Sequence, residues 1–159
     1  MNYKHLILMV FVVFIAVSFY LGYTPLGISV VFLLFSLLAF FYYAKDKKAA
    51  INGAWRVPES TLHLLSLCCG WPGALIAQEN LRHKTKKLSF QLVFWCTVLV
   101  NVGSFAWIHT PQGKIQLRNS LLQLGDLTMT HVKSGTIIST VLFLTEYRPK
   151  SERLSKLNP

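Results

Sequence analysis

Three long runs without a charged residue constrain this chain more than any other feature. They cover residues 6–21, 26–44 and 88–108. A helix needs roughly 20 residues to cross about 30 Å of hydrocarbon, and fewer when flanking side chains reach the headgroups. Only helices satisfy their backbone hydrogen bonds internally in lipid. The sequence therefore predicts an all-α integral membrane protein with transmembrane helices at these three places.

The first run has an alternative interpretation as a signal peptide. Lys4 precedes it, and Ala16-Val17-Ser18 resembles a small-x-small cleavage site. However, Gly22-Tyr23-Thr24-Pro25 is typical of the tight turn of a helical hairpin, and the next apolar run follows at once. This pattern favours a retained first helix.

A fourth apolar segment, residues 58–80, is broken in its middle. Pro58 and Glu59 suit a helix start, by fixed backbone geometry and by charge at the positive end of the dipole. The sequence Gly70-Trp71-Pro72-Gly73 is expected to end or kink this helix, and a second short helix is expected over Ala74–Leu81. Small residues at such a break also allow close helix approach.

This broken segment either crosses the membrane or enters and returns on the same side. A re-entrant segment puts both basic loops, 45–56 and 82–87, in the cytoplasm and leaves only Lys114 and Arg118 outside near the helix ends. That distribution follows the positive-inside rule better than a crossing does, although counting the whole basic tail reverses the preference. We therefore expect a re-entrant segment.

The domain organisation follows from these runs. We expect a helical membrane domain over 1–109 and a basic polar tail over 110–159. Within the tail, 137–144 is apolar but too short to span, so it is either a strand or a stretch on the membrane interface. The last residues, 148–159, have the composition of a disordered end.

The net charge of +10 indicates the class of partner. On a membrane protein, such an excess favours contact with anionic lipid headgroups. Nucleic acid has weaker support because basic loops beside membranes are common. A buried irregular segment also makes a homo-oligomer a reasonable expectation.

Glu59 and His63 are the candidate catalytic pair. They are four residues apart on the predicted helix and so share a face, with Arg56 just ahead of its first turn. A carboxylate beside an imidazole near hydrocarbon has the perturbed proton affinity that acid–base catalysis uses. The simpler interpretation is that Glu59 complements the helix dipole and pairs with Arg56.

A second candidate site is a basic cluster that would bind an anion. Arginine offers a planar fork for phosphate and lysine adds point charge. The simpler interpretation is a positive-inside anchor. The predicted anion-binding residues are Arg56, Arg82, His83, Lys84, Lys86 and Lys87.

Other chemistry has little support. Cys68, Cys69, His63 and His83 are the available metal ligands, but adjacent cysteines do not make the usual C-x-x-C chelate, so no metal and no cofactor is predicted. Asn101, inside the last apolar run, is expected to hydrogen-bond to another helix.

An ordered series of residues resembles domain-of-unknown-function family 1294. The series comprises Asp46-Lys47, Trp55-Arg56, Pro58-Glu59, Leu62-His63, Gly70-Trp71-Pro72-Gly73-Ala74 and Arg82-His83-Lys84-Thr85. The resemblance, over roughly Leu26–Ile108, implies a multi-pass protein of the bacterial inner (cytoplasmic) membrane. Some members carry a cold-shock domain that these residues do not contain, which hints at nucleic acid on the cytoplasmic side. Cys69 stands where many members have glycine.

The family's activity is unknown, so the function stays open between three hypotheses. The first is a binding or scaffold protein whose basic loops contact anionic lipid or a partner. The second is an interfacial enzyme that acts on a phosphate-bearing or lipid substrate through Glu59 and His63. The third is a small transport component, by analogy with interrupted transporter helices. We rank them in this order.

Overall fold

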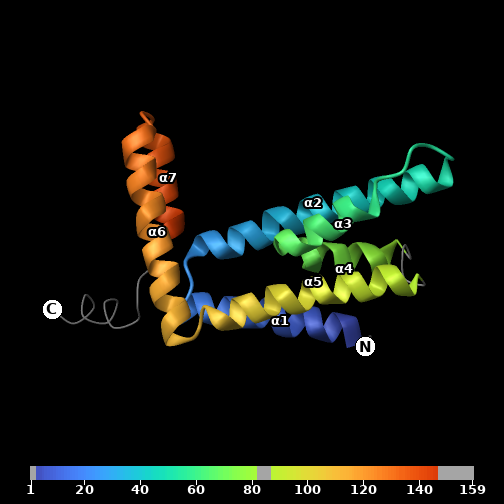
Figure 1. The fold of residues 1–159 in the computed structure, drawn as a ribbon, viewed down its shortest axis with the longest axis horizontal. Coiled ribbons are helices and arrows are strands. Elements are labelled where there is room, and N and C mark those ends of the chain that lie inside the picture. Colours follow the sequence, from blue (N-terminus) through green and yellow to red (C-terminus); the bar gives the residue numbers. More distant parts are fainter. Residues whose placement is uncertain (1–2, 82–86, 147–159) are drawn as a thin grey trace. The chain divides into compact units, whose positions relative to one another are not determined.

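The computed structural model describes residues 3–81 and 87–146, and the regular structure in these ranges is helical. The chain forms two compact units. One, the hairpin unit, comprises residues 30–104. The other, the flanking unit, combines residues 1–29 with the described residues from 105 onward (Figure 1).

Four segments are long and apolar enough to span a membrane. They are α1 (Tyr3–Tyr20), α2 (Leu26–Ile51), the broken segment Glu59–Asn80, and α5 (Leu88–Trp107). This finding confirms the predicted all-α membrane protein. Helix α2 is longer than the apolar run that predicts it, because the basic stretch after Ala44 continues the helix to Ile51.

The broken segment has its break earlier than the sequence suggests. Helix α3 (Glu59–Leu65) passes into a π-type turn, η1 (Ser66–Gly70), and then into α4 (Trp71–Asn80). The backbone leaves helical geometry at Cys68, with ψ 45°, and at Cys69, with φ 69°. The predicted break at 70–73 therefore lies too late in the chain, and the second helix begins at Trp71 instead of Ala74. Pro72 occupies the first turn of α4, where a missing N–H costs nothing.

Helices α3 and α4 fold back on each other as a helical hairpin (Figure 1). The deciding contact is an ion pair in which Lys87 Nζ lies 2.8 Å from Glu59 Oε2. A straight helix over Glu59–Asn80 would hold its ends about 33 Å apart. The five residues between Leu81 and Lys87 are too few to return over that distance and still leave the lysine touching Glu59. Both ends of the hairpin therefore lie at one end of the hairpin unit.

Glycines let the hairpin pack closely on α2. A Cβ at Gly73 would collide with the carbonyl oxygen of Ser36, and one at Gly70 would come within 2.6 Å of the Phe35 carbonyl oxygen. The core of the hairpin unit is built from fully or almost fully buried side chains. These are Ala39, Tyr43, Leu62, Trp71, Ala74, Leu75, Phe90 and Phe94.

The flanking unit contains α1, the start of α2, α6 (Pro111–His131) and α7 (Gly135–Thr145). Thr110 caps α6 by accepting a 3.1 Å hydrogen bond from the Gly113 N–H. The strand considered for 137–144 is wrong, because this stretch forms α7. The expected disordered end, 148–159, lies outside the described residues.

Candidate functional site

An ion pair between Asp46 and Arg56 marks the end of the hairpin unit where α2 ends. Arg56 Nε and Nη2 each donate a 3.2 Å hydrogen bond to Asp46, one to each carboxylate oxygen. The Asp46 side chain is 0% exposed, whereas that of Arg56 is 49% exposed. The hydrogen bonds and the charge of Asp46 raise the pKa of the Arg56 guanidinium. The pair therefore fixes a permanently charged guanidinium. Its Nε–Nη2 edge faces Asp46, and the Arg56 side chain stays half exposed.

Glu59 forms a second ion pair, with Lys87 at the start of α5, at 2.8 Å. The simpler interpretation of the sequence, in which Glu59 pairs with Arg56, thus needs correction: the two acids take different partners. Asp46 holds the loop after α2, and Glu59 holds α5 against the start of α3. Sequence spacing did not reveal either partner, since each pair joins residues from different elements.

His63 lies one turn after Glu59 on α3, as its spacing predicts. Its ring packs against Phe90, with centroids 4.3 Å apart. Glu59 is thus engaged by a lysine and His63 is packed on an aromatic ring. The two residues lie near one another, but this arrangement does not by itself make them an acid–base pair.

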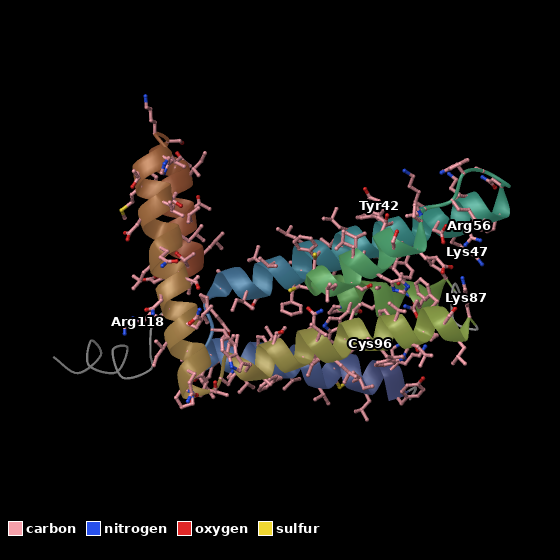
Figure 2. The ribbon with its side chains drawn as sticks, in the orientation of Figure 1. Tyr42, Lys47, Arg56, Lys87, Cys96 and Arg118 are labelled. Atoms are coloured by element: carbon pink, nitrogen blue, oxygen red, sulfur yellow. The ribbon has the colours of Figure 1, made fainter. Side chains whose placement is uncertain are left out.

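Basic residues from the end of α2, from the stretch after it and from just before α5 lie at this end of the hairpin unit. Figure 2 shows Lys47, Arg56 and Lys87 here, where α2 ends and α5 begins. Lys45 and Lys48 also lie near the end of α2, and both are exposed. Four predicted anion-binding residues, Arg82, His83, Lys84 and Lys86, lie outside the described residues. We call the described cations near this end, Lys45, Lys47, Lys48, Arg56 and Lys87, the basic end.

Sequence reasoning missed a buried amide chain behind the basic end. Gln91 Nε2 donates to Gln78 Oε1 at 2.7 Å, and Gln78 Nε2 lies 3.4 Å from the Tyr43 hydroxyl, which accepts the bond. Gln78 and Tyr43 are fully buried. This chain links α2, α4 and α5. Gln78 and Gln91, which lie within two segments apolar enough to span a membrane, were the signal that could have found it.

Asn101 forms the interhelical hydrogen bonds that the sequence predicts. Its Nδ2 donates to the carbonyl oxygens of Leu67 at 2.9 Å and Ser66 at 3.3 Å. It also donates to Thr97 O in its own helix, at 2.9 Å. Both carbonyls on the hairpin belong to η1, where the break interrupts the helical ladder. Asn101 therefore stabilises the turn of the hairpin.

The flanking unit contains a second polar cluster that the sequence did not predict. Ser18 Oγ lies 2.7 Å from His109 Nε2 and 3.1 Å from Thr24 Oγ1. His109 Nδ1 lies 2.8 Å from the Phe105 carbonyl oxygen, which can only accept, so Nδ1–H donates this bond. The His109 ring also stacks on the Phe14 ring, with centroids 5.2 Å apart. This cluster ties the end of α1 to the end of α5.

In the described ranges, no three His, Cys, Asp or Glu side chains are placed to hold a metal ion. Cys68 and Cys69 lie in η1, and His83 lies outside these ranges.

Comparison with known proteins places these features in a family. A family model described as "Protein of unknown function (DUF1294)" matches residues 36–90. The "Uncharacterized protein YsdA" of Bacillus subtilis (strain 168) is 33% identical over 84 residues, which cover 53% of this chain and 94% of that protein. The chain belongs to the DUF1294 family. No solved structure matches it.

The DUF1294 match includes most of the residues described above. It begins on α2 at the point where the hairpin packs, and it ends at Phe90, against which His63 lies. Both ion pairs and both close-packed glycines fall inside it. The match leaves out α1, α6 and α7.

Proposed function

We propose that this protein is a multi-pass protein of the bacterial inner membrane whose basic end binds the phosphate of anionic lipid headgroups on the cytoplasmic face. In this proposal the α3–α4 hairpin is re-entrant, and the protein acts as a binding or scaffold component. The observation that carries the proposal is the Glu59–Lys87 ion pair, because it brings the loop after α2 and the start of α5 to one surface.

The geometry of Arg56 supports phosphate as the ligand. Asp46 occupies the Nε and Nη2 atoms, which leaves Nη1 and the second Nη2 proton for another acceptor. A guanidinium held from behind by a buried acid loses less side-chain entropy when it binds an anion. Lys45 and Lys48 add charge that attracts anionic lipid at about 1 kcal/mol for each residue.

The packing of the hairpin is consistent with its proposed re-entry. Irregular backbone at membrane depth requires cover by protein. The break is covered by α2 at Gly70 and by Asn101 of α5. By contrast, the engagement of Glu59 by Lys87 gives the enzyme hypothesis less support than the binding hypothesis.

Trp55 offers a native probe for the ligand, because it is 95% exposed and precedes Arg56. The full chain is reconstituted in phosphatidylcholine vesicles with added brominated phosphatidylglycerol or brominated phosphatidylcholine. The difference in quenching between wild type and Trp55→Phe isolates Trp55. We expect the anionic lipid to quench Trp55 more strongly at equal mole fraction, and salt to reduce the difference.

A matched pair of variants controls this measurement. Lys45→Gln with Lys48→Gln removes two charges from the basic end and should reduce the preference for anionic lipid. Lys45→Arg with Lys48→Arg keeps both charges and should leave the preference for anionic lipid unchanged. Equal quenching of the wild type by the two lipids would overturn the proposal.

The proposed re-entry has its own test. Single cysteines are placed at Asn52 and Lys86 in a background carrying Cys68→Ala, Cys69→Gly and Cys96→Ala, and they are labelled with an impermeant reagent from each side. Labelling of both from the cytoplasmic side is expected. Labelling from opposite sides would place the two basic loops on different faces and exclude a common lipid site.

A further inference from the structure

Helix α6 in the flanking unit carries a row of exposed polar side chains on one side, with exposed apolar side chains such as Leu122 and Leu127 beside it. On α6, the exposed polar residues Asn119, Gln123, Asp126 and Thr130 recur every three or four positions and so form one row. Gly125 and Thr128 are buried on the side toward α7, where a Cβ at Gly125 would lie 3.6 Å from Leu142. By helical geometry the polar row therefore points away from α7.

Helix α7 has no charged residue, and large apolar side chains remain exposed on it. Ile137 is 53% exposed and Phe143 is 63% exposed. Two of its exposed hydroxyls bond within the helix: Thr140 Oγ1 donates to the Thr136 carbonyl at 2.8 Å, and Ser139 Oγ donates to the same carbonyl at 3.0 Å. Hydroxyls satisfied in this way are tolerated in lipid. At 11 residues the helix is too short to cross a bilayer.

One contact and one short chain connection join this pair to the candidate membrane-spanning helices. A Cβ at Gly27, in the first turn of α2, would lie 2.8 Å from the Leu144 carbonyl oxygen, so the end of α7 touches the start of a candidate span. Helix α6 begins at Pro111, four residues after α5 ends. Within the flanking unit, α6 and α7 run across the direction of α1 rather than along it (Figure 1). Where α1 spans the bilayer, helices that run across it are oriented along the membrane plane.

Basic residues lie on the same side of α6 as α7. Lys114 and Arg118 are four residues apart, and by helical period both fall near the direction of Gly125 and Thr128. Lys114 Nζ also lies 4.4 Å from the centre of the Tyr23 ring, in the turn between α1 and α2. Cations at the edge of an apolar face are what anionic headgroups complement.

We infer that the α6–α7 pair is a lipid-binding surface. Helix α7 lies among the acyl chains at the level of the first turn of α2, and α6 lies above it at headgroup depth, with Lys114 and Arg118 toward anionic lipid. This surface is built from other residues than the basic end and does not depend on the function proposed there. It gives the segment outside the family match a membrane role of its own.

The test compares two pairs of labelled positions in the full chain. Single cysteines carrying the fluorophore NBD are placed at Ile137 and Phe143 on α7, and at Gln123 and Thr130 on the polar row of α6. The background carries Cys68→Ala, Cys69→Gly and Cys96→Ala. In phosphatidylcholine–phosphatidylglycerol vesicles, nitroxide-labelled lipid is expected to quench the α7 positions, whose emission should be blue-shifted. Aqueous iodide is expected to quench the α6 positions.

Two outcomes would overturn the inference. One is strong iodide quenching at Ile137 and Phe143, which would place α7 in water. The other is shielding of both positions from lipid and aqueous quenchers alike, which would mean that a second copy or another protein covers α7. Circular dichroism of each labelled variant confirms that the helices are retained, so that loss of folding is not mistaken for exposure to water.

Discussion

The hairpin unit and the flanking unit differ in where their polar side chains lie and what they bond. In the hairpin unit, polar side chains are buried and bonded across helices, and glycines allow backbones to touch. In the flanking unit, polar contacts lie at helix ends, around His109 and Thr110, or within single helices, while α6 and α7 leave large apolar side chains exposed. The DUF1294 match falls wholly within the hairpin unit. The comparison indicates that the hairpin unit should be the more sensitive to small changes.

We expect Gly73→Ala to lower the free energy of unfolding more than any other substitution considered. Its Cβ would overlap the backbone of Ser36, and a packed backbone cannot move aside as a flexible side chain can. We expect a loss of about 3 kcal/mol or more in the free energy of unfolding, measured by SDS titration with circular dichroism. Gly125→Ala in the flanking unit is the matched control, since its Cβ would make only ordinary contact with Leu142. If both substitutions cost the same, the proposed contrast between the units is wrong.

Arg56→Gln tests the buried acid of the hairpin unit. It removes both hydrogen bonds that the guanidinium gives to Asp46 and leaves a buried carboxylate without this cation. We expect a loss on the order of 2 kcal/mol by the same titration, reduced from the cost of a fully buried pair by the exposure of Arg56. The double variant Asp46→Asn with Arg56→Gln should recover part of it, because the buried charge is gone. A double variant less stable than Arg56→Gln would contradict this account.

Asn101→Ala tests the support of the hairpin turn. Two carbonyl oxygens of η1 lose their donor, and interhelical hydrogen bonds in membrane proteins contribute about 1 kcal/mol. The control is Asn119→Ala on the exposed row of α6, for which we expect almost no change in unfolding free energy. Equal effects at the two asparagines would mean that the carbonyls of η1 find other donors, and that the turn does not depend on α5.

The sequence predicts those structural features that depend only on the residues of one segment. Apolar length alone predicts α1, α2 and α5, and a single asparagine in an apolar run predicts the helix contact of Asn101. Sequence reasoning placed the break too late, because glycine and proline signal irregular backbone whereas Cys69 takes up the left-handed conformation. It missed α6, whose polar composition resembles a loop.

The candidate site was predicted only in part, for a similar reason. Charge density points to the basic loops, and helical spacing points to Glu59 and His63. The partners of Asp46 and Glu59 depend on the return of the hairpin, which is a tertiary arrangement. The pairing of Gln78 with Gln91 likewise joins two helices whose register no local pattern fixes.

Cys69→Gly should give the smallest effect, and one of opposite sign. Cys69 is the described non-glycine residue with positive φ, at 69°, a conformation that costs an ordinary residue about 1 kcal/mol. Glycine removes this strain, but it loses some packing and adds freedom to the unfolded chain. We therefore expect a gain of roughly 0.5 kcal/mol in unfolding free energy. Cys68→Gly is the matched control, because Cys68 has a φ of −77° and relieves no such strain, so that variant should be destabilised. If the two glycine variants were destabilised equally, the hairpin turn would not be strained at Cys69, and the sensitivity of the hairpin unit would rest on packing and polar contacts alone.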